Sequence, residues 1–318
     1  MSADTPLIIP ASPPARQPDA LAGVLWMLLS CALLAGVAAL GRYAALAGMP
    51  PFQIVFLRLV FAVIAISPVL AWRGGEMLRT RHVGSYMLRV VLGLVGMTTW
   101  FWALAYLPVG EVTAIGFLTP LFATVGAALI LGEIVRWRRW TATLVGFSGA
   151  LIILRPGMAE VGIGTWLALV AAIAMAAATL MIKRLSDRDD SEKVVLISLL
   201  MQTPLAAIPA MFVWQWPSLE LWLVLAAMGA VGMLGHITLS RAFRAADASL
   251  VMGADFARLP IAVLFGYVLF GELIDLWTWV GAAVIFGASL YNARRERQVR
   301  RPVRAAGPHA AGSAGIER

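Results

Sequence analysis

The chain has 318 residues, of which 61% are hydrophobic and only 13% carry a charged side chain. An average soluble protein has about 25% charged residues, so this composition excludes a soluble globular domain, a disordered chain and a nucleic-acid-binding protein. The net charge of +8 therefore needs an explanation other than binding to nucleic acid. The single cysteine, Cys31, excludes a disulfide framework and a cysteine-based metal site.

Ten apolar stretches follow a proline-rich segment, residues 1–19, for which we expect no ordered structure. A helix needs about 20 apolar residues to cross the hydrocarbon core of a bilayer, and helix is expected because open strands cannot satisfy their backbone groups in lipid. The predicted spans are Leu21–Leu40, Phe52–Trp72, Tyr86–Leu107, Val112–Leu131, Trp140–Leu154, Ile163–Ile182, Val194–Trp214, Leu219–Ser240, Leu250–Phe270 and Trp277–Tyr291. Residues 293–318 are predicted to form a disordered basic tail.

The distribution of Lys and Arg predicts the orientation of these spans. With a cytoplasmic N-terminus, 20 of the 25 basic residues fall on the cytoplasmic side, where membrane proteins collect them. Only Arg42 and Arg155 fall on the opposite side, and Arg58, Arg89 and Arg258 lie inside spans. Both termini are therefore predicted to be cytoplasmic, and the net positive charge is interpreted as a topology signal.

The sequence also repeats itself with an offset of about 139 residues. Gly93 and Gly96 match Gly232 and Gly235, Gly132-Glu133 matches Gly271-Glu272, and Pro120 matches Pro260 with a one-residue slip. Each repeat holds five spans, an odd number, so the second repeat must enter the membrane from the opposite side. Inverted repeats of this kind are typical of secondary transporters. We expect the four glycines to permit close helix packing and the two prolines to kink or hinge their spans.

Several of these stretches resemble a known family. Leu57-Arg58-Leu59, the stretch from Pro120 to Glu133, and the stretch from Ala257 to Glu272 are similar to the paired EamA domains of the drug/metabolite transporter superfamily. The resemblance covers about residues 20–292, with repeat 1 at 20–155 and repeat 2 at 156–292. It implies an all-α integral membrane protein of ten transmembrane helices, built as two inverted five-helix EamA-type repeats.

The resemblance also implies a bacterial inner membrane location and transport of small metabolites, often export. The stretch from Ala248 to Leu259 looks most like branches that include riboflavin and S-adenosylmethionine uptake carriers.

Asp255 and Arg258 are the first candidates for a substrate site. They lie three residues apart in the ninth span and so share a helix face. A charged residue near the bilayer centre costs about 2.5–3.5 kcal/mol on insertion scales, so two of them call for a compensating role. In the functional interpretation, Arg258 binds an anionic or carbonyl group and Asp255 binds a cationic group or a proton. In the alternative, the two form an ion pair that only fixes packing.

Four further residues are weighed in the same way. Arg58 is interpreted either as a substrate contact or as a side chain that extends to the membrane interface. His236 is interpreted either as a proton relay or as an ordinary hydrogen-bonded histidine. Trp100 or Trp102 offers a flat substrate a stacking surface, unless both only anchor the helix at the interface. Arg89 is interpreted as an interfacial anchor.

No catalytic constellation, phosphate-binding Gly-Lys-Ser/Thr motif or metal-ligand spacing is present in the sequence, so we expect neither an enzyme nor a cofactor or metal. The main hypothesis is a secondary transporter that moves a small polar or zwitterionic metabolite, amino-acid-like or drug-like, by alternating access. The alternatives are an importer of riboflavin, S-adenosylmethionine or a similar planar metabolite, and a non-transporting membrane scaffold. The expected partners are a small-molecule substrate, the lipid bilayer, protons as coupling ion and a second copy in a homodimer.

Overall fold

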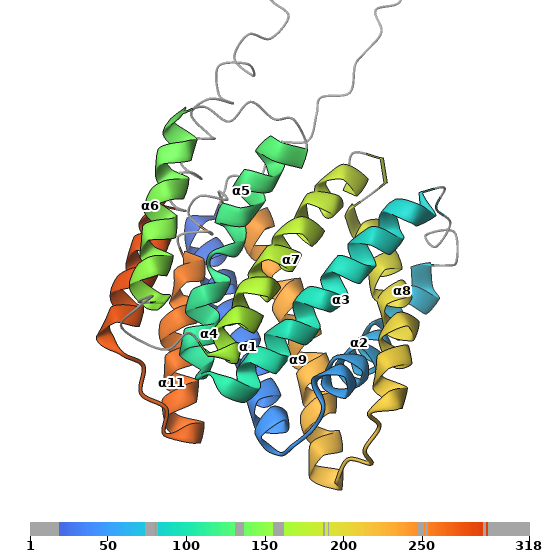
Figure 1. Ribbon diagram of the computed structural model, residues 1–318. Helices are drawn as coiled ribbons and strands as arrows, with labels where there is room; N and C mark the ends of the chain where they lie inside the picture. The colour runs from blue at the N-terminus through green and yellow to red at the C-terminus, as the bar shows by residue number, and fades with distance from the viewer. Residues whose placement is uncertain are drawn as a thin grey trace, which may run out of the picture.

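The computed structural model describes residues 19–73, 80, 82–130, 137–154, 162–186, 188–189, 191–246, 251, 254–288 and 291. Regular secondary structure within these residues is entirely helical, as predicted (Figure 1). The elements are α1 (Ala20–Leu46), α2 (Pro51–Arg73), α3 (Val83–Tyr106), α4 (Val109–Gly116), α5 (Thr119–Ile130), α6 (Trp137–Leu154), α7 (Ile163–Ser186), α8 (Ser191–Phe212), α9 (Leu219–Ala245), the 3-10 turn η2 (Asp255–Ala257), α11 (Arg258–Phe270) and a final helix, Leu276–Ala288.

Seven stretches of helix in the described part of the chain are long and apolar enough to cross a membrane. They are α1, α2, α3, α4 and α5 taken together, α7, α8 and α9. Shorter apolar helices lie at Thr143–Ile153 within α6, at α11 and at Leu276–Ala288, where the fifth, ninth and tenth spans were predicted. α6 and Leu276–Ala288 adjoin residues outside the described ranges, and α11 directly follows η2. The protein is therefore a multi-pass membrane protein, and the count of ten spans stays a prediction.

The helical geometry of the fourth and ninth predicted spans changes next to their prolines, and a kink or hinge at these prolines stays a prediction. α4 ends at Gly116 and α5 begins at Thr119, so Pro120 is the second residue of α5. Pro260 is likewise the third residue of α11, which begins after η2. A proline in the first turn of a helix removes no helical hydrogen bond, because those N–H groups have no intrahelical acceptor. Pro120 thus lies in the first turn of α5, and Pro260 lies in the first turn of α11, directly after the 3-10 turn η2.

The helices pack in a pattern that occurs twice. α3 runs along α7 and α1 runs along α9, and these are the two most extensive helix contacts (Figure 1). α11 packs on α1 as α5 packs on α7, while α2 contacts both α8 and α9. The same arrangement therefore links the first helix of one half to the third helix of the other, in both directions.

Close approach at these contacts depends on glycine. A Cβ added to Gly96 would lie 2.9 Å from Met175 Cγ on α7, and one added to Gly235 would lie 2.8 Å from Leu34 Cδ2 on α1. Both distances are too short for a real contact, so a side chain at either position would force the neighbouring atoms to move.

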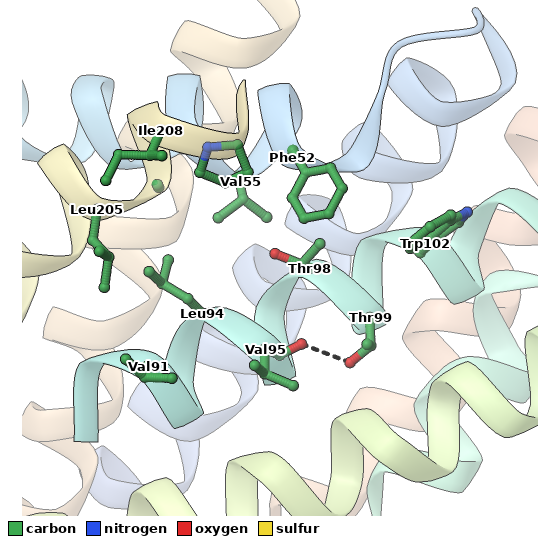
Figure 2. Close-up of a pocket in the computed structure, with 12 residues that line it drawn as sticks. Phe52, Val55, Val91, Leu94, Val95, Thr98, Thr99, Trp102, Leu205 and Ile208 are labelled. Carbon is green, nitrogen blue, oxygen red and sulfur yellow. Dashed lines mark hydrogen bonds between the residues drawn. The ribbon is translucent and has the colours of Figure 1, made fainter. Parts of the chain in front are cut away.

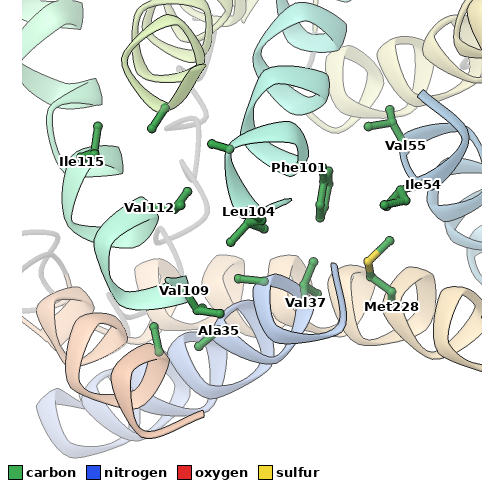
Figure 3. Packing of buried hydrophobic residues seen from close by; sticks show 14 of the residues in the cluster. Ala35, Val37, Ile54, Val55, Phe101, Leu104, Val109, Val112, Ile115 and Met228 are labelled. Atoms are coloured by element: carbon green, nitrogen blue, oxygen red, sulfur yellow. The ribbon is translucent and has the colours of Figure 1, made fainter. Parts of the chain in front are cut away.

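The main apolar core joins the two halves near one end of the bundle (Figure 3). α1 contributes Val37, α2 contributes Ile54, α3 contributes Leu104, and α9 contributes Met228. Val109 at the start of α4 is also fully buried in this cluster. These contacts hold α1, α2, α3, α4 and α9 together.

The same end of the bundle is closed by two polar contacts. The Gln53 side chain donates from Nε2 to the Gln215 carbonyl (2.6 Å) and accepts from the Gln215 backbone N–H at Oε1 (3.0 Å). Glu272 pairs with Arg42 through Oε1 and Nε at 2.8 Å, and its Oε2 accepts the Val109 N–H at 2.9 Å. Gln53 is fully buried, and Arg42 and Glu272 are nearly so. Gln53 thereby joins the start of α2 to the α8–α9 connection. Glu272, just after α11, joins that end to α1 and α4.

Candidate functional site

Asp255 and Arg258 form an ion pair at the break that precedes α11. Asp255 lies in η2 and Arg258 is the first residue of α11, so the 3-10 turn brings Asp255 Oδ1 against Arg258 Nη2. Their side chains are 28% and 29% exposed, so the pair is accessible and does not lie sealed between packed helices. Cys31 of α1 donates its thiol to the Asp255 carbonyl and to Oδ1, at 3.6 Å each. The predicted pair is therefore present and held against α1.

Arg58 approaches from α2. Its Nη1 lies 2.7 Å from Met97 Sδ, and its guanidinium lies 5.8 Å from the centre of the Phe101 ring, both on α3. An added Cβ at Gly232 would stand 3.6 Å from Arg58 Nη2, so the guanidinium also lies along α9. Arg58 Nε is buried and has no hydrogen-bond partner among the described residues. This arginine points into the bundle and not toward the interface.

His236 of α9 lies near both Arg58 and Arg258. Arg58 and Arg258 are both close enough to act on His236 electrostatically. The His236 side chain is solvent-exposed in the structure. Arg258 Nε, like Arg58 Nε, is buried with no partner in the described part of the chain. The structure therefore gathers four of the predicted site residues, which come from α2, α9 and the η2–α11 break.

The two tryptophans of α3 have different surroundings. Trp100 is partly buried, packs against the main core, and contacts α4 at Gly116, where an added Cβ would lie 2.8 Å from its Cζ3. Trp102 lies elsewhere, 6.0 Å from the Phe52 ring. Phe101 is the aromatic ring beside Arg58, and the sequence analysis did not single it out. It lies four residues after Met97, so both side chains share one face of α3.

Trp102 and Phe52 line a groove of about 420 Å³ between α2, α3 and α8 (Figure 2). The rest of its lining is almost entirely aliphatic, and the Thr99 hydroxyl is already bonded to the Val95 carbonyl at 2.7 Å. A polar metabolite would find few hydrogen-bond partners there. We therefore place the candidate site at the polar cluster and not at this groove, and a stacking role for Trp102 stays a prediction.

This cluster is suited to binding and not to bond breaking. Two guanidinium groups have unused N–H donors, which suit a ligand with acceptor atoms such as carbonyl oxygens or ring nitrogens. Phe101 adds a flat apolar surface beside them. Within the described residues, no group of three His, Cys, Asp or Glu side chains could hold a metal ion.

The family of this chain follows from its similarity to known proteins. The EamA-like transporter family matches it twice, at residues 21–155 and at residues 162–293. The chain belongs to the EamA-like transporter family. It is a membrane transporter and not an enzyme, and the two matched ranges follow the two repeats expected from the sequence.

Named transporters are similar to this EamA-like protein over nearly their whole length. A riboflavin transporter of Vibrio cholerae is 36% identical, over 88% of this chain and 97% of the relative. A riboflavin transporter of Brucella anthropi is 32% identical, over 85% and 98%. An S-adenosylmethionine uptake transporter of Rickettsia prowazekii is 28% identical, over 87% and 94%. These relatives favour the alternative hypothesis of a planar metabolite over the main one of an amino-acid-like substrate.

One solved crystal structure has a similar fold, with a TM-score of 0.58 at 19% sequence identity. The match covers 86% of this chain and 98% of that chain, so the helical arrangement is shared almost throughout.

Proposed function

We propose that this protein imports a planar, uncharged heteroaromatic metabolite of the flavin type, riboflavin being the first choice. The proposal rests on one observation: Arg58, His236 and Arg258 lie close together, and both arginines have N–H donors that no described residue uses. The similarity to two riboflavin transporters supports the same substrate class. The fused ring of a flavin carries carbonyl oxygens and ring nitrogens along one edge, and these accept hydrogen bonds from guanidinium groups.

The charge of the cluster argues against the other substrates considered. Arg58 and Arg258 bring two positive charges, and the one carboxylate, Asp255, is already paired with Arg258. A cationic substrate such as S-adenosylmethionine would meet like charge here, and the ammonium group of an amino acid would find no free carboxylate among these residues. An uncharged ring with acceptor atoms avoids both costs, and Phe101 lies where such a ring could pack.

Transport is proposed to occur by alternating access between two inverted halves of five spans each, in a bacterial inner membrane with both termini cytoplasmic. The doubled packing of α1 with α9 and α3 with α7, together with the two family matches, supports this symmetry. The end closed by Gln53 and by Arg42–Glu272 would then be the periplasmic end. Import would require these contacts to break before substrate reaches Arg58 from outside.

The test is flux into proteoliposomes that contain the purified protein. Riboflavin, S-adenosylmethionine and a set of amino acids are offered in parallel, each with and without an inward proton gradient. Saturable riboflavin uptake is expected, and stimulation by the gradient would support protons as coupling ion, with Asp255 and His236 as the titratable groups of the site. Uptake of amino acids without riboflavin would contradict the proposal, and no flux from correctly folded protein would favour the scaffold hypothesis.

A further inference from the structure

Arg89 is a third arginine with buried guanidinium atoms that have no hydrogen-bond partner among the described residues. It lies on α3, six residues after the helix begins at Val83, and its Nε and Nη1 atoms make no hydrogen bond with any described residue. An unpaired guanidinium surrounded by membrane helices is costly, so such a group normally has a partner in the functional state. The protein itself supplies none to these two atoms within the described ranges.

The direction of the side chain contradicts the expected role as an interfacial anchor. An anchor would extend toward the near end of α3 at Val83, and helical side chains normally lean toward the N-terminus of their helix. Arg89 does the opposite, because its Nη1 lies 3.5 Å from the Cβ position of Gly93, one turn further along the helix. The guanidinium therefore points deeper into the bundle.

Gln202 of α8 meets Arg89 at the same glycine. Its Cδ lies 3.7 Å from the Cβ position of Gly93, and the side chain is buried. Gly93 corresponds to Gly232 in the repeat, and Gly232 is the glycine along which Arg58 lies. Gln202 thus faces α3 from α8 in the way that Arg58 faces α9 from α2. The repeat matches the two glycines, whereas Arg58 and Gln202 lie 144 residues apart and are not matched positions.

Both groups adjoin the proposed flavin site. With about 100° of rotation per residue, Arg89, Gly93, Met97 and Trp100 lie within an arc of about 80° on α3. Met97 contacts Arg58 and lies one turn, about 6 Å along the axis, beyond Gly93. A ligand held at Arg58 therefore needs to extend by roughly one helical turn to reach Arg89 and Gln202.

We propose that Arg89 and Gln202 form a second polar anchor, which binds the hydroxyl-bearing tail of a flavin whose ring lies at Arg58 and Arg258. This inference rests on the proposed function, because it takes the ring position from it. The tail of riboflavin is a chain of hydroxyl groups that begins at the ring, and its oxygens accept hydrogen bonds from guanidinium and amide donors.

The experiment compares riboflavin with lumiflavin, which has the same ring and a methyl group in place of the tail. Binding to the purified protein is measured by equilibrium dialysis for wild type, Arg89→Gln, Arg89→Lys, Gln202→Leu and the control Arg244→Gln. Arg244 is an exposed basic residue in the last turn of α9, outside the cluster. Arg89→Gln is expected to raise the Kd of riboflavin about tenfold or more and that of lumiflavin less than twofold. Gln202→Leu should act in the same direction with a smaller change, and Arg89→Lys should retain part of the affinity.

Equal weakening of both flavins by Arg89→Gln, or no weakening of either, would overturn the second anchor while leaving the proposed function standing. Unchanged lumiflavin binding also shows that each variant is folded at the ring site. If the wild type binds neither flavin, the proposed function itself is wrong and the anchor with it.

Discussion

α3 and α9 pack alike but present different chemistry to the centre of the bundle. Thr99 donates its hydroxyl to the carbonyls of Val95 (2.7 Å) and Gly96 (3.2 Å), and Thr238 donates in the same way to Leu234 (3.0 Å) and Gly235 (2.9 Å). The glycines of both helices face a partner helix at less than contact distance. The two helices thus share their close glycine packing and the hydrogen bonds from matched threonine hydroxyls to backbone carbonyls.

The difference between the two helices lies one residue after the second glycine of each. α3 has Met97 there and α9 has His236, and both lie near Arg58. The helix that faces α9 supplies Arg58, whereas the helix that faces α3 supplies the neutral Gln202. A nearly symmetric scaffold therefore carries an asymmetric site, which is what binding of an unsymmetrical ring requires.

Loss of Arg58 should have the largest effect on transport. Arg58→Gln removes the charge and leaves a shorter polar side chain, so we expect riboflavin uptake to fall by about 10- to 100-fold, the cost of losing hydrogen bonds from a charged donor. Initial uptake rates in proteoliposomes measure this, with Arg244→Gln as a control of equal charge change. Wild-type uptake by Arg58→Gln would show that the arginine only packs between α2, α3 and α9.

An exchange of Met97 and His236 tests whether the two positions are equivalent about the symmetry axis. His236→Met alone should lower riboflavin uptake by about tenfold or less, because one polar contact is removed. The double variant Met97→His/His236→Met restores an imidazole beside Arg58 from the other helix, so we expect it to recover part of the loss. An exchange variant no better than the single variant would mean that only α9 presents this group correctly.

The sequence identified the polar residues of the site but not their aromatic neighbour. Arg58, His236, Asp255 and Arg258 stand out because polar groups are rare in apolar spans, and that rarity has the same physical cause as their cost in the membrane. Phe101 is one of 13 phenylalanines in an apolar chain, so only the contact with Arg58 distinguishes it.

The helix breaks were also beyond sequence reasoning. Pro120 and Pro260 marked the correct places, but a proline within an apolar run is compatible with a kinked helix and with the start of a new one. The direction of Arg89 was interpreted wrongly for a similar reason. Its sequence position gives the depth of its Cα, whereas its interaction depends on which way a long side chain turns.

The matched glycines should differ in their tolerance of alanine. At Gly96 an added Cβ meets the backbone nitrogen of Met175 at 3.2 Å as well as its side chain, whereas at Gly235 it meets only the side chains of Leu34 and Leu33. Backbone cannot rotate away as a leucine side chain can, so Gly96→Ala should destabilise the protein by about 1–3 kcal/mol and Gly235→Ala by less. Thermal unfolding in detergent measures both, and an equal or reversed order would contradict this account.

The smallest expected effect concerns the side-chain hydrogen bonds near the first turns of α3 and α9. Tyr86 of α3 donates to Asp189 at 3.0 Å, and Tyr43 of α1 donates to Glu220 in the first turn of α9. Partial desolvation acts to raise the pKa of Asp189, but hydrogen bonds from Lys193 and Tyr86 outweigh it and hold that pKa below its ordinary value.

A lowered pKa in the folded protein means that ionised Asp189 stabilises the fold at neutral pH, and that this contribution is lost as the pH falls from the ordinary value, about 4, through the lowered one. Asp189→Asn should therefore lower the Tm at pH 7 by at most about 2–4 °C, since partly exposed ion pairs contribute little. The difference in Tm between wild type and variant should shrink as the pH approaches 3. A difference that persists unchanged at low pH would mean that Asp189 acts through packing, and that the fastening of α3 does not depend on charge.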